Sequence, residues 1–100
     1  MSEHPLTTVM KLDPAFMDIL NNADSAIYAN GALPKKIKLL MAMAFDAAHG
    51  AVLGVRSLAQ QAMREGATKE EIAETIRVAY QLSGIGSVYT ASQGLKDLFD

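Results

Sequence analysis

Residues 33–72 decide the fold of this chain: LPKKIKLLMAMAFDAAHGAVLGVRSLAQQAMREGATKEEI. Apolar residues recur at helical spacing on both sides of Gly50, which predicts two helices joined at that glycine. Residues 68–71 then have the pattern of a capping box. In such a box the Thr68 hydroxyl accepts from the Glu71 amide, and the Glu71 carboxylate accepts from the Thr68 amide. The stretch therefore predicts a helical hairpin followed by the start of another helix.

Helical signals continue on both sides of this stretch. Asp13 followed by Pro14 predicts a helix start, because an N-cap acceptor precedes the residue that is best tolerated at the first helical position. After the capping box, a break at Gly84 separates two further helical segments, and no segment alternates as a strand would. The sequence predicts an all-α antiparallel bundle of about five helices. It forms one domain over residues 1–100, with 1–12 as a loose N-terminal arm.

The two central helices each have an expected apolar side. On the helix before Gly50 this side consists of Ile37, Leu40, Met41, Ala44, Ala47 and Ala48. On the helix after Gly50 it consists of Val52, Val55, Leu58, Ala59, Ala62 and Met63. Two such stripes should pack against each other and form the centre of the core.

Composition excludes several classes of function. The net charge of −2 gives no electrostatic reason to bind nucleic acid or an anionic membrane. No run of 18 apolar residues predicts a transmembrane helix. The chain has no cysteine, which excludes disulfides, thiolate metal sites and thiol nucleophiles. Residues 1–10 lack the pattern of a signal peptide, so we expect a cytoplasmic protein.

The central stretch resembles the carboxymuconolactone decarboxylase and alkylhydroperoxidase D family. That family's pattern opens a helix with LP-x-K-x-K-E-L and closes it with Asn-Gly-Cys. It continues as Cys-x-x-Cys-x-x-x-His and reaches Gly-Ala-Thr-x-Glu-Glu-Ile. Here Leu33, Pro34, Gly50 and residues 66–72 match, and the spacing from Gly50 to Gly66 has no gap. The resemblance implies the family's helical fold and a homo-oligomer, either a trimer or a hexamer.

The departures from this pattern fall on the positions that the family uses for chemistry. The family's glutamate falls on Leu39, its two cysteines on Ala51 and Gly54, and its histidine on Leu58. A thiolate is the nucleophile in the redox chemistry of such a pair, and no residue here replaces it. The resemblance therefore implies a family member without thiol redox chemistry, with a pocket at these four positions between the two central helices.

Three other residues are candidates for a site. Asp46 and His49 are three apart on one helix, so the carboxylate could orient the imidazole as a general base. The alternative is a terminal histidine stabilised by the helix dipole. Arg56 could hold a carboxylate ligand, although an exposed arginine on an amphipathic helix is the commoner case. No metal site is expected, because His4 is the only other histidine and lies in the arm.

Three functions stay open at this point, and whether the protein is an enzyme is undecided. The first is a family protein that binds a small molecule in the interhelical pocket, without a cofactor. The second is a non-catalytic oligomeric binding or assembly protein. The third is a lactone decarboxylase-like lyase with a relocated acid/base such as His49. The surroundings of Leu39 and Leu58 discriminate between these functions. If both are buried and dry, they favour a non-enzyme. If they line an open cavity into which His49 or Arg56 points, they favour an enzyme.

Overall fold

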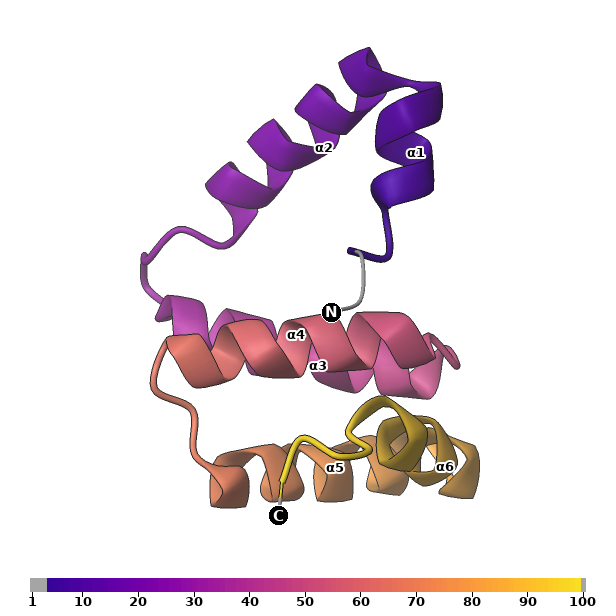
Figure 1. The fold of residues 1–100 in the computed structure, drawn as a ribbon. Helices are drawn as coiled ribbons and strands as arrows, with labels where there is room; N and C mark the ends of the chain where they lie inside the picture. The colour runs from indigo at the N-terminus through magenta and orange to yellow at the C-terminus, as the bar shows by residue number, and fades with distance from the viewer. Residues whose placement is uncertain (1–3, 100) are drawn as a thin grey trace.

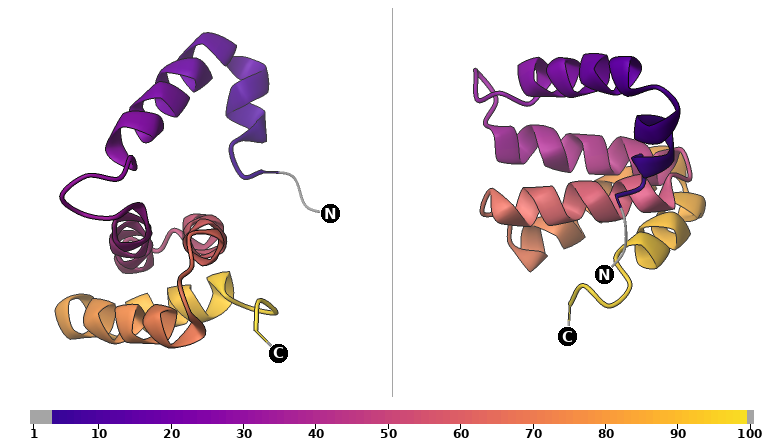
Figure 2. Two further views of the ribbon diagram at one scale, coloured as in Figure 1. Left: turned by 90° about the vertical axis from the view of Figure 1, so that its left-hand side faces the viewer. Right: turned by 45° about the horizontal axis from the view of Figure 1, so that its top comes forward.

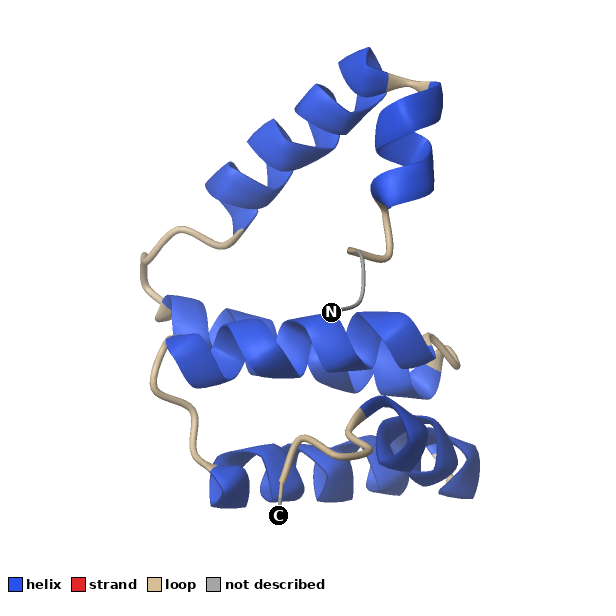
Figure 3. Ribbon diagram, viewed as in Figure 1, coloured by secondary structure: helices blue, strands red, loops and turns tan. Residues whose placement is uncertain are grey.

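The computed structural model describes residues 4–99, and in this part of the chain helices are joined by loops and turns, with no strand (Figures 1 and 3). Its helices are α1 (Thr7–Leu12), α2 (Pro14–Ile27), α3 (Lys35–Ala48), α4 (Val52–Arg64), α5 (Lys69–Ser83) and α6 (Ile85–Gly94). The predicted all-α class is confirmed. None of these helices combines the length and the apolar character that crossing a bilayer requires.

The helices form two packed layers and an arch. Helices α3 and α4 lie side by side in one layer, and α5 and α6 form the layer beneath them (Figures 1 and 2). The core lies between these layers, and its largest fully buried side chains are Leu39, Met43, Val55 and Ile72. Helices α1 and α2 pack on each other and rise as an arch on the other side of α3 and α4. We call this pair the α1–α2 arch.

Local signals place the helix ends. The Asp13 carboxylate accepts a 3.1 Å hydrogen bond from the Phe16 amide at the start of α2. The capping box that precedes α5 is complete, with both reciprocal bonds between Thr68 and Glu71 present. Gly50 ends the α3 segment with a φ of +77°, a conformation that costs glycine little and other residues more. These starts and stops follow the sequence prediction because they depend on residues only a few positions apart.

The apolar side of α3 differs from the prediction. Leu39, Leu40, Met43 and Ala47 are the buried residues of this helix. Met41, which was expected on the core side, is 46% exposed, and Phe45 is 64% exposed. The cause is that α3 is apolar around most of its circumference, so helical spacing alone allows two registers. The neighbouring layer selects one of them and leaves the other apolar side open.

The arch is less integrated than the sequence suggests. Part of the region expected as a loose arm is helical, as α1, and neither α1 nor α2 contains a buried residue. Several large apolar side chains of the arch are instead exposed, including Leu12, Phe16 and Ile19. Lys38 of α3 holds the connection after α2, because its Nζ donates to the carbonyls of Ile27 and Ala29 at 2.9 and 2.8 Å. The arch is therefore anchored through its linker more than through packing.

Candidate functional site

An open cavity of about 420 Å³ lies between the α1–α2 arch and the α3–α4 layer. We call it the inner cavity. It is lined by His4, Pro5, Leu6, Asp24, Tyr28, Asp46, Leu53, Gly54, Ser57, Leu58 and Gln61. A volume of this order is in the usual range for small-molecule sites. Its walls come from the arch on one side and from α3 and α4 on the other.

Two of the four positions that correspond to the family's chemical residues reach this cavity. Gly54 and Leu58 line it, since both lie on the face of α4 that looks toward the arch. Leu39 is fully buried in the core between the layers and is not among the lining residues. Ala51 is the N-cap residue of α4, half-buried, and also lies outside the lining. Leu39 and Leu58 therefore have different surroundings in the structure. Leu39 lies in the core, whereas Leu58 lines the open inner cavity.

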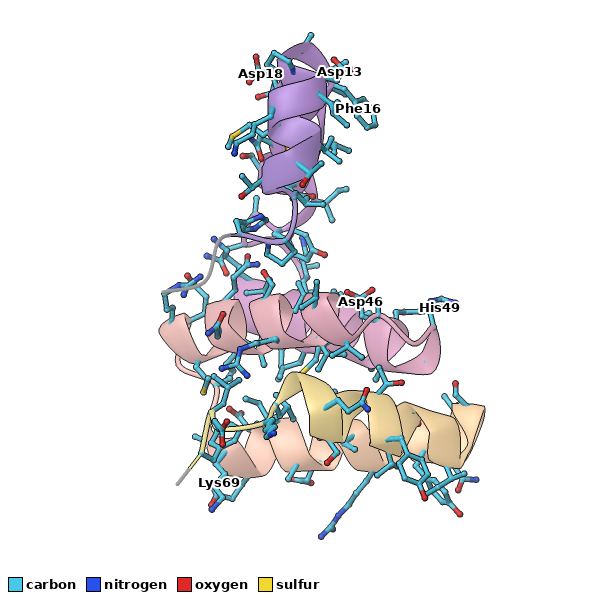
Figure 4. All side chains as sticks on the ribbon, turned by 45° about the vertical axis from the view of Figure 1, so that its right-hand side comes forward. Asp13, Phe16, Asp18, Asp46, His49 and Lys69 are labelled. Atoms are coloured by element: carbon cyan, nitrogen blue, oxygen red, sulfur yellow. The ribbon has the colours of Figure 1, made fainter. Side chains whose placement is uncertain are left out.

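Asp46 brings a carboxyl group to the inner cavity. It lies near the end of α3, on the side that faces the arch, and its side chain is half-buried (Figure 4). Burial raises the pKa of this carboxyl above the usual range of an aspartate, and the nearby His49 partly opposes the rise. The physical cause of the rise is that an ionised carboxylate loses solvation when its surroundings exclude water. Asp46 thus holds a proton more readily than an exposed aspartate does.

The position of Asp46 depends on the absence of a side chain at residue 54. A Cβ placed on Gly54 would lie 2.9 Å from Asp46 Cγ and in direct collision with Asp46 Oδ2. The carboxyl therefore occupies the volume into which a side chain at position 54 would project. A cysteine at this position requires Asp46 to move first, which a comparison of sequence patterns did not reveal.

His49 lies at the end of α3 and faces solvent. It is the C-cap residue of the helix (Figure 4). Its ring stacks on that of Phe45 with a centroid distance of 6.5 Å. Within residues 4–99 no hydrogen bond joins it to Asp46, and it does not line the inner cavity. The two residues do share one side of α3, as predicted, but only Asp46 reaches the cavity.

Residues from α2 complete the polar wall, and the sequence analysis did not identify them. Tyr28 and Asp24 line the inner cavity opposite Asp46. The pKa of the Tyr28 phenol is raised, first by burial and then by the negative charges of Asp24 and Asp46, so the group stays protonated and can donate. The sequence offered no signal for this, because residues 24 and 28 meet the cavity wall of α4 only through the tertiary fold, from about 30 residues away along the chain.

Arg56 has a different surrounding from the one expected for a ligand-binding arginine. Its Nη1 donates to the backbone carbonyls of Gly94 and Lys96 at 3.2 and 2.6 Å, which ties α4 to the end of α6. The residue also borders an adjoining open cavity of about 550 Å³ beside α2, which shares much of its wall with the inner cavity. We call this second space the outer cavity. Arg56 thus uses part of its guanidinium group to connect α4 to the end of α6.

The polar groups of the site do not form a metal centre. Among residues 4–99 no group of three or more histidine, aspartate or glutamate side chains lies close enough to hold an ion. Carboxyl, phenol, hydroxyl and amide groups remain, together with the apolar walls of Leu53 and Leu58. This arrangement can bind a small molecule that is partly apolar, with Asp46 able to exchange a proton with it and Tyr28 able to donate a hydrogen bond to it.

Comparisons with known proteins agree with this architecture. Residues 14–97 match the model of the carboxymuconolactone decarboxylase family. The structure is similar to the crystal structure of apo-lpg0406, a carboxymuconolactone decarboxylase family protein from Legionella pneumophila. The two are 31% identical with a TM-score of 0.81, and the match covers 91% of this chain and 81% of that one. A search of curated proteins gave no match. The family model spans most of the chain, and the protein therefore belongs to the carboxymuconolactone decarboxylase family.

Proposed function

We propose that this family member binds a small molecule in the inner cavity and works without thiol chemistry. The observation that supports this most directly is the lining of the cavity. It combines Gly54 and Leu58, at positions that the family uses for chemistry, with the polar groups of Asp46 and Tyr28. The chain has no cysteine, so a thiolate cannot act at residue 51 or 54.

Proton transfer is the chemistry that this wall supports if the protein is an enzyme. The carboxyl of Asp46 has a raised pKa, and a group of this kind can serve as a general acid or base when substrate lies within hydrogen-bond reach. A lyase with a relocated acid/base would therefore use Asp46, with His49 acting on it through its charge from the end of α3. Asp46 lines the inner cavity and His49 does not, which favours this candidate over one in which His49 itself contacts the substrate.

A non-catalytic assembly protein is the second candidate, and a separate observation supports it. An apolar groove of about 300 Å³ runs between α3 and α5. Its lining includes Met41, Phe45, Val78 and Leu82, all of which are exposed in the single chain. Together with the exposed apolar residues of the arch, this is more uncovered apolar surface than scattered side chains account for. We propose that the protein is a homo-oligomer, as the family resemblance implies.

Light scattering at micromolar concentration tests the oligomer. We expect a mass that is a multiple of the 10.7 kDa chain, with a trimer or hexamer as the specific expectation. The variant Phe45→Glu places a charge in the α3–α5 groove and should shift the population toward smaller species. A single species of chain mass for the unmodified protein would contradict the proposal.

A fluorescence titration tests ligand binding. The chain has no tryptophan, so Leu53→Trp introduces one reporter at the wall of the inner cavity. Leu82→Trp is the matched control, since it also replaces an exposed leucine but lies in the α3–α5 groove. We expect benzyl alcohol to change the emission of Leu53→Trp in a saturable way and to leave Leu82→Trp without a saturable response. Saturation at Leu82→Trp alone, or at neither position, would contradict binding in the inner cavity.

A further inference from the structure

The unusual feature of the inner cavity is the pairing of Asp46 with Gly54. These residues lie on different helices, α3 and α4, and face each other across the hairpin. The missing side chain of Gly54 leaves a volume at the cavity wall, and the Asp46 carboxyl fills it. Any Cβ at residue 54 would collide with this carboxyl, so a side chain there requires the carboxyl to leave the position that it occupies.

Glycine in the interior of a helix has a cost that requires an explanation. It destabilises a helix interior by about 1 kcal/mol relative to alanine, and this is the upper limit of its cost in a first turn. Gly54 lies in the first turn of α4, and its φ is not in the left-handed region where glycine is favoured. Backbone conformation therefore does not account for the residue, whereas the space required by Asp46 does.

We propose that Asp46 is the proton-transfer group of the inner cavity and that Gly54 is the positioning residue that admits its carboxyl there. This deepens the proposed function, on which it rests. The carboxyl takes the volume of a side chain at residue 54, so a carboxylic acid stands where the family pattern places a thiol. An ionisable group is therefore kept at this point of the cavity wall, but it is a carboxyl group in place of a thiol.

The groups around Asp46 define the class of ligand that suits it. Asp24 of α2 and Tyr28, the C-cap residue of that helix, line the cavity together with His4 of the N-terminal segment. His49 lies outside the lining and acts on Asp46 only through its charge. Arg56 of α4 donates to the backbone carbonyls of Gly94 and Lys96, and no cationic side chain of α4 lines the inner cavity. The two carboxyl groups disfavour an anionic ligand, and the protonated phenol can donate a hydrogen bond to a ligand oxygen. The wall fits a small, partly apolar molecule that presents an amine or a hydroxyl group.

The same groups set the direction of the pH dependence. Below its raised pKa, Asp46 is neutral and donates a hydrogen bond to a ligand oxygen. Above that pKa it is ionised and accepts one from a hydroxyl or an ammonium group. An ammonium ligand should therefore bind more tightly as the pH rises through the pKa of Asp46.

The first experiment measures Asp46 directly by carbon-13 NMR titration of its carboxyl group, without any ligand. In the unmodified protein we expect Asp46 to titrate above the ordinary range of aspartate. In Gly54→Ala the methyl group displaces the carboxyl toward solvent, and the pKa should return toward its ordinary value. Gly86→Ala is the matched control, because a Cβ on this helical glycine meets no atom within 4 Å. An unchanged Asp46 titration in Gly54→Ala would overturn the positioning role.

The second experiment measures the affinity for benzylamine. We expect Asp46→Asn to weaken benzylamine binding about tenfold, which is the usual scale for losing a hydrogen bond between charged groups. Asp18→Asn, on an exposed part of α2, should leave the affinity unchanged. Equal affinity of the unmodified protein and Asp46→Asn would overturn the inference. If benzyl alcohol still binds the cavity in that case, the proposed function stands and only the role of Asp46 fails. If neither probe binds, both fail.

Discussion

Gly94 offers the sharpest test of how the core is packed. This residue ends α6 and is buried against the first turns of α4. A Cβ on Gly94 would lie 2.8 Å from the Val52 carbonyl oxygen and 2.9 Å from both Cβ and Cγ1 of Val55. Neither neighbour can give way cheaply: one is a backbone atom of a helix, and Val55 is fully buried. Gly94→Ala should therefore force α6 away from α4.

The expected loss follows from two opposing terms. Overpacking a well-packed core costs about 1–3 kcal/mol, and replacing glycine by alanine in a helix returns up to about 1 kcal/mol. At the last residue of α6 the second term is small, so the net destabilisation should be about 1–2 kcal/mol. For a domain of this size that corresponds to a fall in Tm of about 5–15 °C.

Thermal and urea unfolding, followed by circular dichroism, measure this loss. The matched control is Gly86→Ala in the same helix, where the added methyl group meets no neighbour. That variant should be as stable as the unmodified protein or more stable by up to about 1 kcal/mol. The comparison separates helix propensity from packing. If Gly94→Ala were as stable as Gly86→Ala, α6 would not approach α4 as described, and the reasoning would be refuted.

Three further predictions concern the capping box and the missing thiols. Thr68→Ala should destabilise the protein by about 1 kcal/mol in urea unfolding, since it removes the acceptor for the Glu71 amide; an unchanged midpoint would mean that α5 does not depend on this cap. The backbone amide of Thr68 and the Lys36 ammonium lower the pKa of Glu71, so its contribution is present above the ordinary pKa and is lost as the pH falls through the lowered one. The stability gap between the unmodified protein and Glu71→Gln should therefore shrink in acid, and a constant gap would argue against this linkage. Peroxide consumption with a dithiol donor should be absent, because the chain has no cysteine, whereas a cysteine-bearing family member is the positive control; comparable turnover would disprove the absence of thiol chemistry.

The parts of the fold that the sequence predicted are those set by short-range chemistry. Asp13, Gly50 and the capping box at Thr68 act on residues within a few positions, so their patterns can be read directly. The buried side of α3 could not be assigned in the same way, because both Leu40 and Met41 fit an apolar stripe. Only the position of the neighbouring layer decides which of the two is buried.

The same limit applies to the candidate site: positions within one helix could be predicted, and contacts between distant segments could not. Gly54 and Leu58 could be placed at the cavity because the gap-free spacing after Gly50 fixes their register on α4. The different surroundings of Asp46 and His49 could not be predicted, since a spacing of three residues places both on one side of α3 and does not show where that side meets a wall. The place of Tyr28 in the cavity could not be predicted either, because it depends on how the α1–α2 arch folds over α4.

The arch described above has a consequence for how a ligand enters. A segment without buried side chains opens at a small fraction of the free energy needed to unfold the whole domain. Neither α1 nor α2 contains a buried residue, so in a single chain their amide hydrogens should exchange with solvent far faster than those of α3 and α4. The α1–α2 arch is therefore the wall of the inner cavity that is least protected from hydrogen exchange. The opposite wall, formed by α3 and α4, belongs to the most protected part of the fold. We therefore expect the proposed ligand to enter by a local opening of the α1–α2 arch, without disturbing the helices that hold Asp46 and Gly54.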